Sequence, residues 1–314
     1  MRYKRFGLLL LIGLAAALLV SACSMPGGSS SGSSTPQSNL TVMQVLQNSQ
    51  KAMSQLKSAH VDLDIKGSGQ SSGSASPTTG SPIPSGAVNF SLIGHGDEAL
   101  PSQEQMNLTV TQSVTNTPNT VTEILSGGKL YAQFGGQWYV LNGSSGGVEQ
   151  PLTGLSSPDM SQLLGLLSHM QIVDHGDQSL NGTSLRHITF KLDKFALQQL
   201  LDSNSQLVNM VGKANIDAVI NNTQTFNATL DLWIDETQFY VHRTELKLNL
   251  NVNPAGIGQS ITPTPGSPIS GSLPTSALTN LDSIVDLSNF NQPVSITPPA
   301  NATPVTIPTV TATP

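Results

Sequence analysis

The sequence contains very little cysteine, aromatic side chain or charge. There is one cysteine in 314 residues, aromatic residues make up 4% and charged residues 10% of the chain, and the net charge is -6. A single cysteine excludes an internal disulfide framework. No cluster of lysine or arginine follows Arg5, so the chain offers no basic surface for nucleic acid. Abundant serine, threonine, asparagine and glutamine favour an exported β-rich protein over a cytosolic helical enzyme.

The first residues have the order of parts found in an export signal. Arg2, Lys4 and Arg5 precede the apolar run "LLLLIGLAAALLV", which small residues and Cys23 follow. A positive start, a short apolar core and small residues are typical of a secretory signal. The stretch "LVSAC", which ends at Cys23, resembles the bacterial lipobox, and this resemblance implies cleavage before Cys23 and a diacylglyceryl group on its thiol. The alternatives are a plain signal peptide with an accidental cysteine and a short membrane anchor.

A lipidated Cys23 would anchor the chain to the outer face of the bacterial cell membrane, because two or three acyl chains hold a protein stably in a bilayer. Composition shifts then divide the chain. We expect a signal peptide at 1–22, a flexible Gly/Ser-rich tether at 23–38, a single domain at 39–297 with long loops at 67–86 and 254–280, and a disordered tail at 298–314.

Alternating apolar and polar residues dominate the expected domain. The stretch "HVDLDIKG" and several like it have the period of strands with one buried face. Helical spacing of apolar residues occurs at about 40–58, after Pro158, and from Lys194 to about Ile220. About ten such strands and three helices predict an α+β fold, a strongly curved antiparallel β half-barrel with the helices covering its concave face.

An Asn-Gly turn at 181–182 is the strongest hairpin signal in the chain. With this turn, Asp177 lies opposite Arg186 and is expected to pair with it, and His175 and His187 point to opposite faces. This register argues against a metal site built on "DHGD". Three Gly-x-Ser-x-Gly matches lie in Gly/Ser-rich stretches that lack the strand-turn-helix setting of a nucleophile elbow. We therefore assign no catalytic residue, metal or cofactor.

The order of these parts resembles the LprG/LppX family of bacterial lipoproteins, which has a LolA-like fold. The resemblance covers residues 40–297 and rests on "LQNSQKAMSQLKSAHVDLDIKG", "SGGKLYAQFGGQWYVL", "SLNGTSLRHITFKL" and "LDLWIDETQFYVHRTELKL". It implies an apolar cavity between the half-barrel and its helices, used to carry acylated lipids or glycolipids in the cell envelope. The two long loops and the tail after Pro298 depart from the family pattern.

We therefore expect a monomeric, non-catalytic lipoprotein that binds a lipid or acylated glycolipid and carries or presents it, with a membrane transporter as a candidate partner. Moving a 16-carbon acyl chain through water costs on the order of 12 kcal/mol, so such a ligand needs a lined cavity. The alternative is an envelope scaffold or sensor with a solid core. The predicted lining is apolar and comprises Val42, Leu46, Met53, Leu63, Phe90, Leu108, Leu163, Leu167, Ile188, Phe190, Leu232, Leu246 and Leu248.

Overall fold

The structure is a computed structural model. It describes residues 39–71, 86–113, 118–142, 160–203, 213–252 and 276–305. Contacts divide the chain into two units, Met1–Pro36 and Gln37–Pro314, and every described residue belongs to the second. The predicted signal peptide, Cys23 and the tether up to residue 38 lie outside the described residues. Within the described residues, no helix has both the length and the hydropathy needed to cross a membrane.

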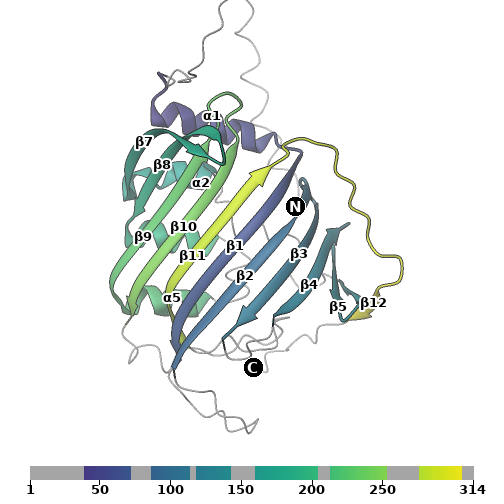
Figure 1. The fold of residues 1–314 in the computed structure, drawn as a ribbon. Helices are drawn as coiled ribbons and strands as arrows, with labels where there is room; N and C mark the ends of the chain where they lie inside the picture. Colours follow the sequence, from purple (N-terminus) through teal and green to yellow (C-terminus); the bar gives the residue numbers. More distant parts are fainter. Residues whose placement is uncertain are drawn as a thin grey trace, which may run out of the picture. The chain divides into compact units, whose positions relative to one another are not determined.

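Twelve strands of the described residues form one open, curved sheet (Figure 1). The strand order is β12-β6-β5-β4-β3-β2-β1-β11-β10-β9-β8-β7, and every pair is antiparallel except β12 with β6. The predicted half-barrel of antiparallel strands is therefore confirmed. The strands are β1 Ser58–Ser71, β2 Gly86–Ala99, β3 Gln103–Gln112, β4 Asn119–Ser126, β5 Lys129–Phe134, β6 Gln137–Asn142, β7 Met170–Leu180, β8 Thr183–Leu192, β9 Thr223–Ile234, β10 Val241–Val252, β11 Ser276–Ser288 and β12 Thr303–Val305.

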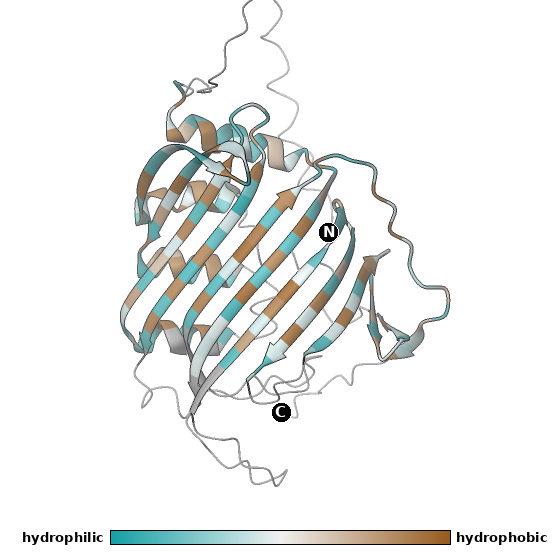
Figure 2. Ribbon diagram, viewed as in Figure 1, coloured by the Kyte–Doolittle hydropathy of each residue, from teal (hydrophilic) through white to brown (hydrophobic). Residues whose placement is uncertain are grey.

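Each strand carries unlike side chains on its two sides, because successive residues point to opposite faces of a sheet. Leu63 of β1 lies opposite Val285 of β11, and both are buried. We call the face that bears these two residues the apolar face. The next residue, Asp64, lies opposite Ile284 on the other side, which we call the polar face. Figure 2 shows this alternation of hydrophilic and hydrophobic residues along the strands.

Helices cover one half of the apolar face. Thr41 caps the first helix, because its side chain accepts from the backbone of Gln44 while the Gln44 side chain accepts from the backbone of Thr41. Buried residues of four α-helices pack against those of β8, β9 and β10 in one hydrophobic cluster. This packing is the reason for the helical spacing in the sequence. The helices are α1 Val42–Ser54, α2 Met160–Gly165, the 3-10 helix η2 Leu167–His169, α3 Lys194–Ser203 and α5 Lys213–Asn222.

A second hydrophobic cluster lies on the same face of β1, β3 and β11. It contains Val61, Leu63, Met106, Leu108 and Val285, all of them buried. Strand β2 runs between β1 and β3 and contributes two glycines here. A Cβ atom on Gly94 would lie 2.7 Å from Cδ2 of Leu108, and one on Gly96 would lie 2.6 Å from Sδ of Met106. Strand β3 therefore fills the space that the two glycines leave, with the Leu108 side chain at Gly94 and with the Met106 side chain and the Gln105 backbone at Gly96.

The register of the β7–β8 hairpin differs from the expectation in one respect. The turn is at 181–182 and Asp177 lies opposite Arg186, as predicted, but a bulge follows between Asp174 and Gly176. A bulge places one extra residue on one strand and shifts the faces beyond it. His175 therefore stacks on His187, with ring centroids 4.4 Å apart, so the prediction that they point to opposite faces is wrong.

The ion pair of Arg186 also differs from the prediction. Nε and Nη2 of Arg186 donate to the two carboxylate oxygens of Asp174 at 2.8 and 2.5 Å, and Nη1 donates to Glu236 at 3.3 Å. Within the described residues, Asp177 makes no hydrogen bond to Arg186. Although partial burial tends to raise the pKa of Asp174, the hydrogen bonds from Arg186 and Gly176 hold that pKa below its usual range. Asp174 is therefore the main partner of this buried guanidinium, and Glu236 is a second one.

Ordered chain extends further than the sequence predicted. Strand β12, Thr303–Val305, lies in the segment expected to be a disordered tail, so that expectation is wrong for these residues. The predicted loops are also shorter, because β1 continues to Ser71 and β11 begins at Ser276. Residues 72–85, 253–275 and 306–314 lie outside the described chain, as does the expected helix start at 157–159.

The Arg186 pair gives a test of the hairpin register. We expect Asp174→Ala to lower the free energy of unfolding at pH 7 by about 2 kcal/mol, because it leaves a buried guanidinium without its main acceptor. Asp177→Ala is the matched control. Burial and the charge of Glu236 raise the pKa of Asp177, so removing this carboxylate should leave stability unchanged or slightly higher. Urea unfolding of both variants measures this, and equal losses would contradict the assignment of Asp174.

Candidate functional site

The predicted lining residues lie on the apolar face of the sheet or on the helices that cover it. Of the thirteen, ten belong to the helix-covered cluster or pack against it: Val42, Leu46, Met53, Leu163, Leu167, Ile188, Phe190, Leu232, Leu246 and Leu248. Leu63 and Leu108 belong to the second cluster, against which Met53 also packs. Phe90 belongs to neither cluster. Its ring lies over Gly67, where a Cβ atom would be 2.1 Å from Cε1.

These residues differ in how much surface they expose. Leu46, Leu163, Ile188, Phe190 and Leu232 are fully buried against one another, as in a packed core. Five others are only partly buried: Val42, Met53, Phe90, Leu167 and Leu246. A ligand can reach the second group without displacing the core. The predicted residues therefore lie on one face of the sheet or on its helices. Some of them are core residues, and others are accessible. That they line a cavity stays a prediction.

A row of side chains, all apolar except one serine, crosses the middle of the sheet. Successive strand pairs place Leu230 opposite Leu246, Ile65 opposite Leu92, and Leu92 opposite Val110, with Ser283 between Leu246 and Ile65. Leu246, Ile65, Leu92 and Val110 are all partly exposed. Because neighbouring strands are about 4.8 Å apart, this row spans about 24 Å from β9 to β3. It connects the helix-covered half of the apolar face to the other half.

Ionisable side chains occur on the apolar face beyond this row, and Glu123 is the one whose pKa is raised furthest among the described residues. Glu123 of β4 lies opposite Met106 on β3 and Ala132 on β5, both of which are buried. Among the described residues it has no hydrogen-bond or ion-pair partner. Desolvation raises its pKa to about 7, from an ordinary value of 4.5. Near neutral pH this carboxyl group is therefore divided between its neutral and charged forms, and its neutral form can donate a hydrogen bond.

The sequence contains a signal that predicts the position of Glu123 on the apolar face. In "VTEIL" the residues Val121, Glu123 and Leu125 are alternate residues of one strand, so their side chains point to the same face of the sheet. If Val121 and Leu125 lie on the apolar face, Glu123 lies there as well. Glu98 and Glu104 lie opposite each other on this face. Both are buried and take part in polar interactions. No group of three or more His, Cys, Asp or Glu side chains in the described chain could hold a metal ion.

Comparison with known proteins finds likeness only among solved structures, since no family model and no curated protein matches the chain. LprF from Mycobacterium bovis is 15% identical with a TM-score of 0.41, and the match covers 82% of this chain and 96% of that one. The Mycobacterium tuberculosis lipoprotein LppX is 13% identical with a TM-score of 0.37, and the match covers 82% of this chain and all of that one.

Glu123 gives a pH-dependent test of this part of the apolar face. A carboxyl group whose pKa is raised by folding binds its proton more tightly in the folded state, so stability falls as pH rises from about 4.5 through about 7. We expect Glu123→Gln to remove this loss and to be more stable than the wild type by up to about 3 kcal/mol at pH 8. The difference should vanish at pH 4. Urea unfolding across this pH range measures it, and parallel pH profiles would place Glu123 in water.

Proposed function

We propose that this chain is an exported, membrane-anchored lipoprotein that binds the acyl chains of a lipid or glycolipid on the apolar face of its sheet and carries or presents that lipid in the cell envelope. The observation that carries the proposal is the row from Leu230 to Val110, in which four apolar side chains, those of Leu246, Ile65, Leu92 and Val110, are partly exposed. It is continuous with a helix-covered cluster, and no charged residue lies within it.

The energetics favour such a ligand. Each methylene group moved from water to an apolar surface gains about 0.8 kcal/mol, so an acyl chain lying along a row of about 24 Å gains several kcal/mol. Only a few polar groups are needed to orient a ligand in a mostly apolar site. Glu123 is a polar group on the same face, on the strand next to β3, and its neutral form could donate a hydrogen bond to a hydroxyl, ester or amine of a lipid headgroup.

The second candidate is a scaffold or sensor with a solid core. The full burial of Leu46, Ile188 and Phe190 against one another favours it for the helix-covered half. In this case the partly exposed row would hold no ligand, and function would depend on the surface. The two candidates differ in what co-purifies with the protein.

Mass measurement of the purified protein separates the two candidates. Residues 24–314, expressed in a bacterium and purified without detergent, should show an extra mass in native spectra that is lost on denaturation and corresponds to a lipid. We expect Leu246→Glu to reduce the loaded fraction about tenfold or more, because it places a carboxylate within the apolar row. An unloaded wild-type protein, also after incubation with a lipid extract of the host, would support the solid core.

The control for this measurement is Ile93→Glu. Ile93 is 52% exposed and lies on the polar face, opposite Asp64. The substitution introduces the same charge into the same sheet without touching the apolar row, so lipid loading should remain at the level of the wild type. Equal loss in both variants would show that Leu246 has no specific role. Circular dichroism of both variants verifies folding.

The anchor is tested separately in the full-length chain. Cys23→Ser removes the thiol that would carry the diacylglyceryl group, so we expect the protein to leave the detergent phase and the membrane fraction and to migrate differently in gels. The lipid loading of the folded domain should not change. Unaltered membrane retention of the variant would exclude lipidation of Cys23 as the anchor.

A further inference from the structure

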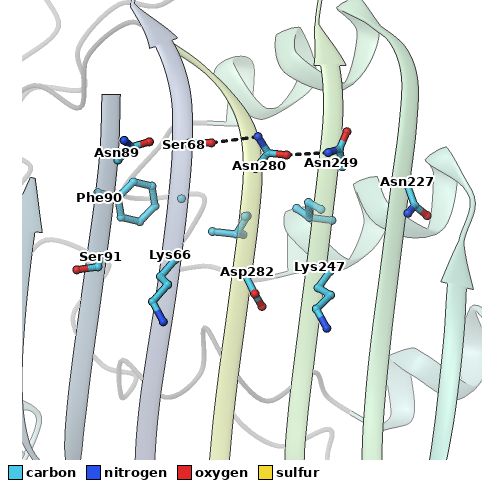
Figure 3. A pocket seen from close by; sticks show the side chains of 13 residues that line it. Lys66, Ser68, Asn89, Phe90, Ser91, Asn227, Lys247, Asn249, Asn280 and Asp282 are labelled. Carbon is cyan, nitrogen blue, oxygen red and sulfur yellow. Dashed lines mark hydrogen bonds between the residues drawn. The ribbon is translucent and has the colours of Figure 1, made fainter. Parts of the chain in front are cut away.

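The polar face carries an open depression of about 600 Å³ at one end of five strands (Figure 3). It crosses β2, β1, β11, β10 and β9, where polar-face residues line it together with Gly67, Phe90, Leu248 and Leu281, whose place in the strand alternation is on the apolar face. Its polar residues form two rows across the strands, the first with one residue from each of the five strands and the second with one residue from each of four. The first row, which we call the amide row, is Asn89, Ser68, Asn280, Asn249 and Asn227; the second includes Ser91, Lys66, Asp282 and Lys247.

Hydrogen bonds fix the middle of the amide row. Nδ2 of Asn249 donates to Oδ1 of Asn280 at 2.8 Å, and Nδ2 of Asn280 donates to Oγ of Ser68 at 3.0 Å. Figure 3 shows these side chains in line across the strands. The side chains of Asn89 and Asn227, at the two ends, have no partner among the described residues. The row therefore has hydrogen-bonded side chains in its middle and unpaired amides at its two ends. Neighbouring members of the row are about 4.8 Å apart, which is the distance between adjacent strands.

The charges of the depression do not suit an anionic ligand. Nζ of Lys66 lies 2.7 Å from Oδ2 of Asp64, and Nζ of Lys247 lies 2.5 Å from Oε1 of Glu245. Asp282 stands opposite both lysines on the intervening strand. Two ammonium groups thus face three carboxylates, which leaves no positive charge to attract a phosphate or sulfate.

The floor of the depression contains an acceptor without a donor. Oδ1 of Asp282 is buried and has no hydrogen-bond partner in the described chain. A buried acceptor without a partner is unfavourable, and a donor that reaches it is favoured. The side chains of Lys66 and Lys247 that flank it are 63% and 53% exposed. They can therefore move aside for a ligand hydroxyl.

A carboxamide offers a donor and an acceptor from one group, and so does each hydroxyl of a sugar. We propose that this depression binds a neutral glycan chain, which lies across β2, β1, β11, β10 and β9 along the amide row. The lipid proposed for the opposite face is not needed for this interaction. A membrane-anchored protein with such a site would dock on the polysaccharide of the envelope while its apolar face remains free.

Asparagine side-chain signals provide the direct test. The mature chain, labelled with ¹⁵N at asparagine, is titrated with neutral hexasaccharides of glucose, mannose, galactose and N-acetylglucosamine. We expect at least one of them to shift the side-chain resonances of Asn227, Asn249 and Asn280, with the same affinity at low and high salt. No shift with any probe would overturn the proposal. So would a sulfated hexasaccharide that binds more tightly than the neutral one and loses affinity with salt.

Three variants locate the site. Asn249→Ala with Asn280→Ala should weaken the hexasaccharide about tenfold or more, and Asn227→Ala, which breaks no hydrogen bond among the described residues, should weaken it less without affecting folding. Asn107→Ala is the matched control, since Asn107 lies on the polar face of β3 outside the depression and bonds Thr122. Unchanged affinity in the first two variants, or equal loss in the control, would overturn the assignment. Lipid loading should be normal in all three.

Discussion

The pairing of β1 with β11 is the interaction on which the rest of the structure depends. It joins the first strand in the sequence to the eleventh. Next to this pairing, Oγ of Ser58 donates to the backbone carbonyl of Gln292, 234 residues away, at 2.6 Å. Without this pairing β2 to β6 and β7 to β10 would form two separate sheets. With it, both hydrophobic clusters lie on one face, and the apolar row continues from β10 through Ser283 and Ile65 to β3.

Both proposed sites follow from the same register. Because side chains alternate, the residues that build the apolar row and those that build the amide row are neighbours in sequence, such as Leu248 and Asn249. The apolar row and the amide row lie on opposite faces of the sheet, and a shift by one residue in the pairing of a central strand would exchange the faces of its side chains. The helices cover only part of the apolar face. Side chains under the helices are therefore packed in a core, whereas side chains on other strands of the same face are partly exposed.

The sequence predicted the local elements well, because alternation and helical spacing are local signals. The Asn-Gly turn at 181–182 and the fold class are confirmed. The bulge at His175 was missed, although an isolated glycine inside a strand pattern, here Gly176, is a sequence signal for one; in the structure Gly176 has a φ of 69°. The β1–β11 partnership and the amide row were not predicted, because neighbours in different strands are invisible without the register. Glu123 could have been found from parity alone.

The pairing of two strands that lie far apart in the sequence also determines when the chain can fold. Sheets dominated by pairings of high sequence separation fold slowly, since the entropy of closing a long loop must be overcome before the pairing forms. Strand β1 gains its partner β11 only when almost the entire polypeptide has emerged from the ribosome. A chain that leaves the cell through a narrow channel must stay unfolded until it has crossed. The pairing of β1 with β11 cannot form before the last long strand has been synthesised, and this delay in folding suits the export that we propose for the chain.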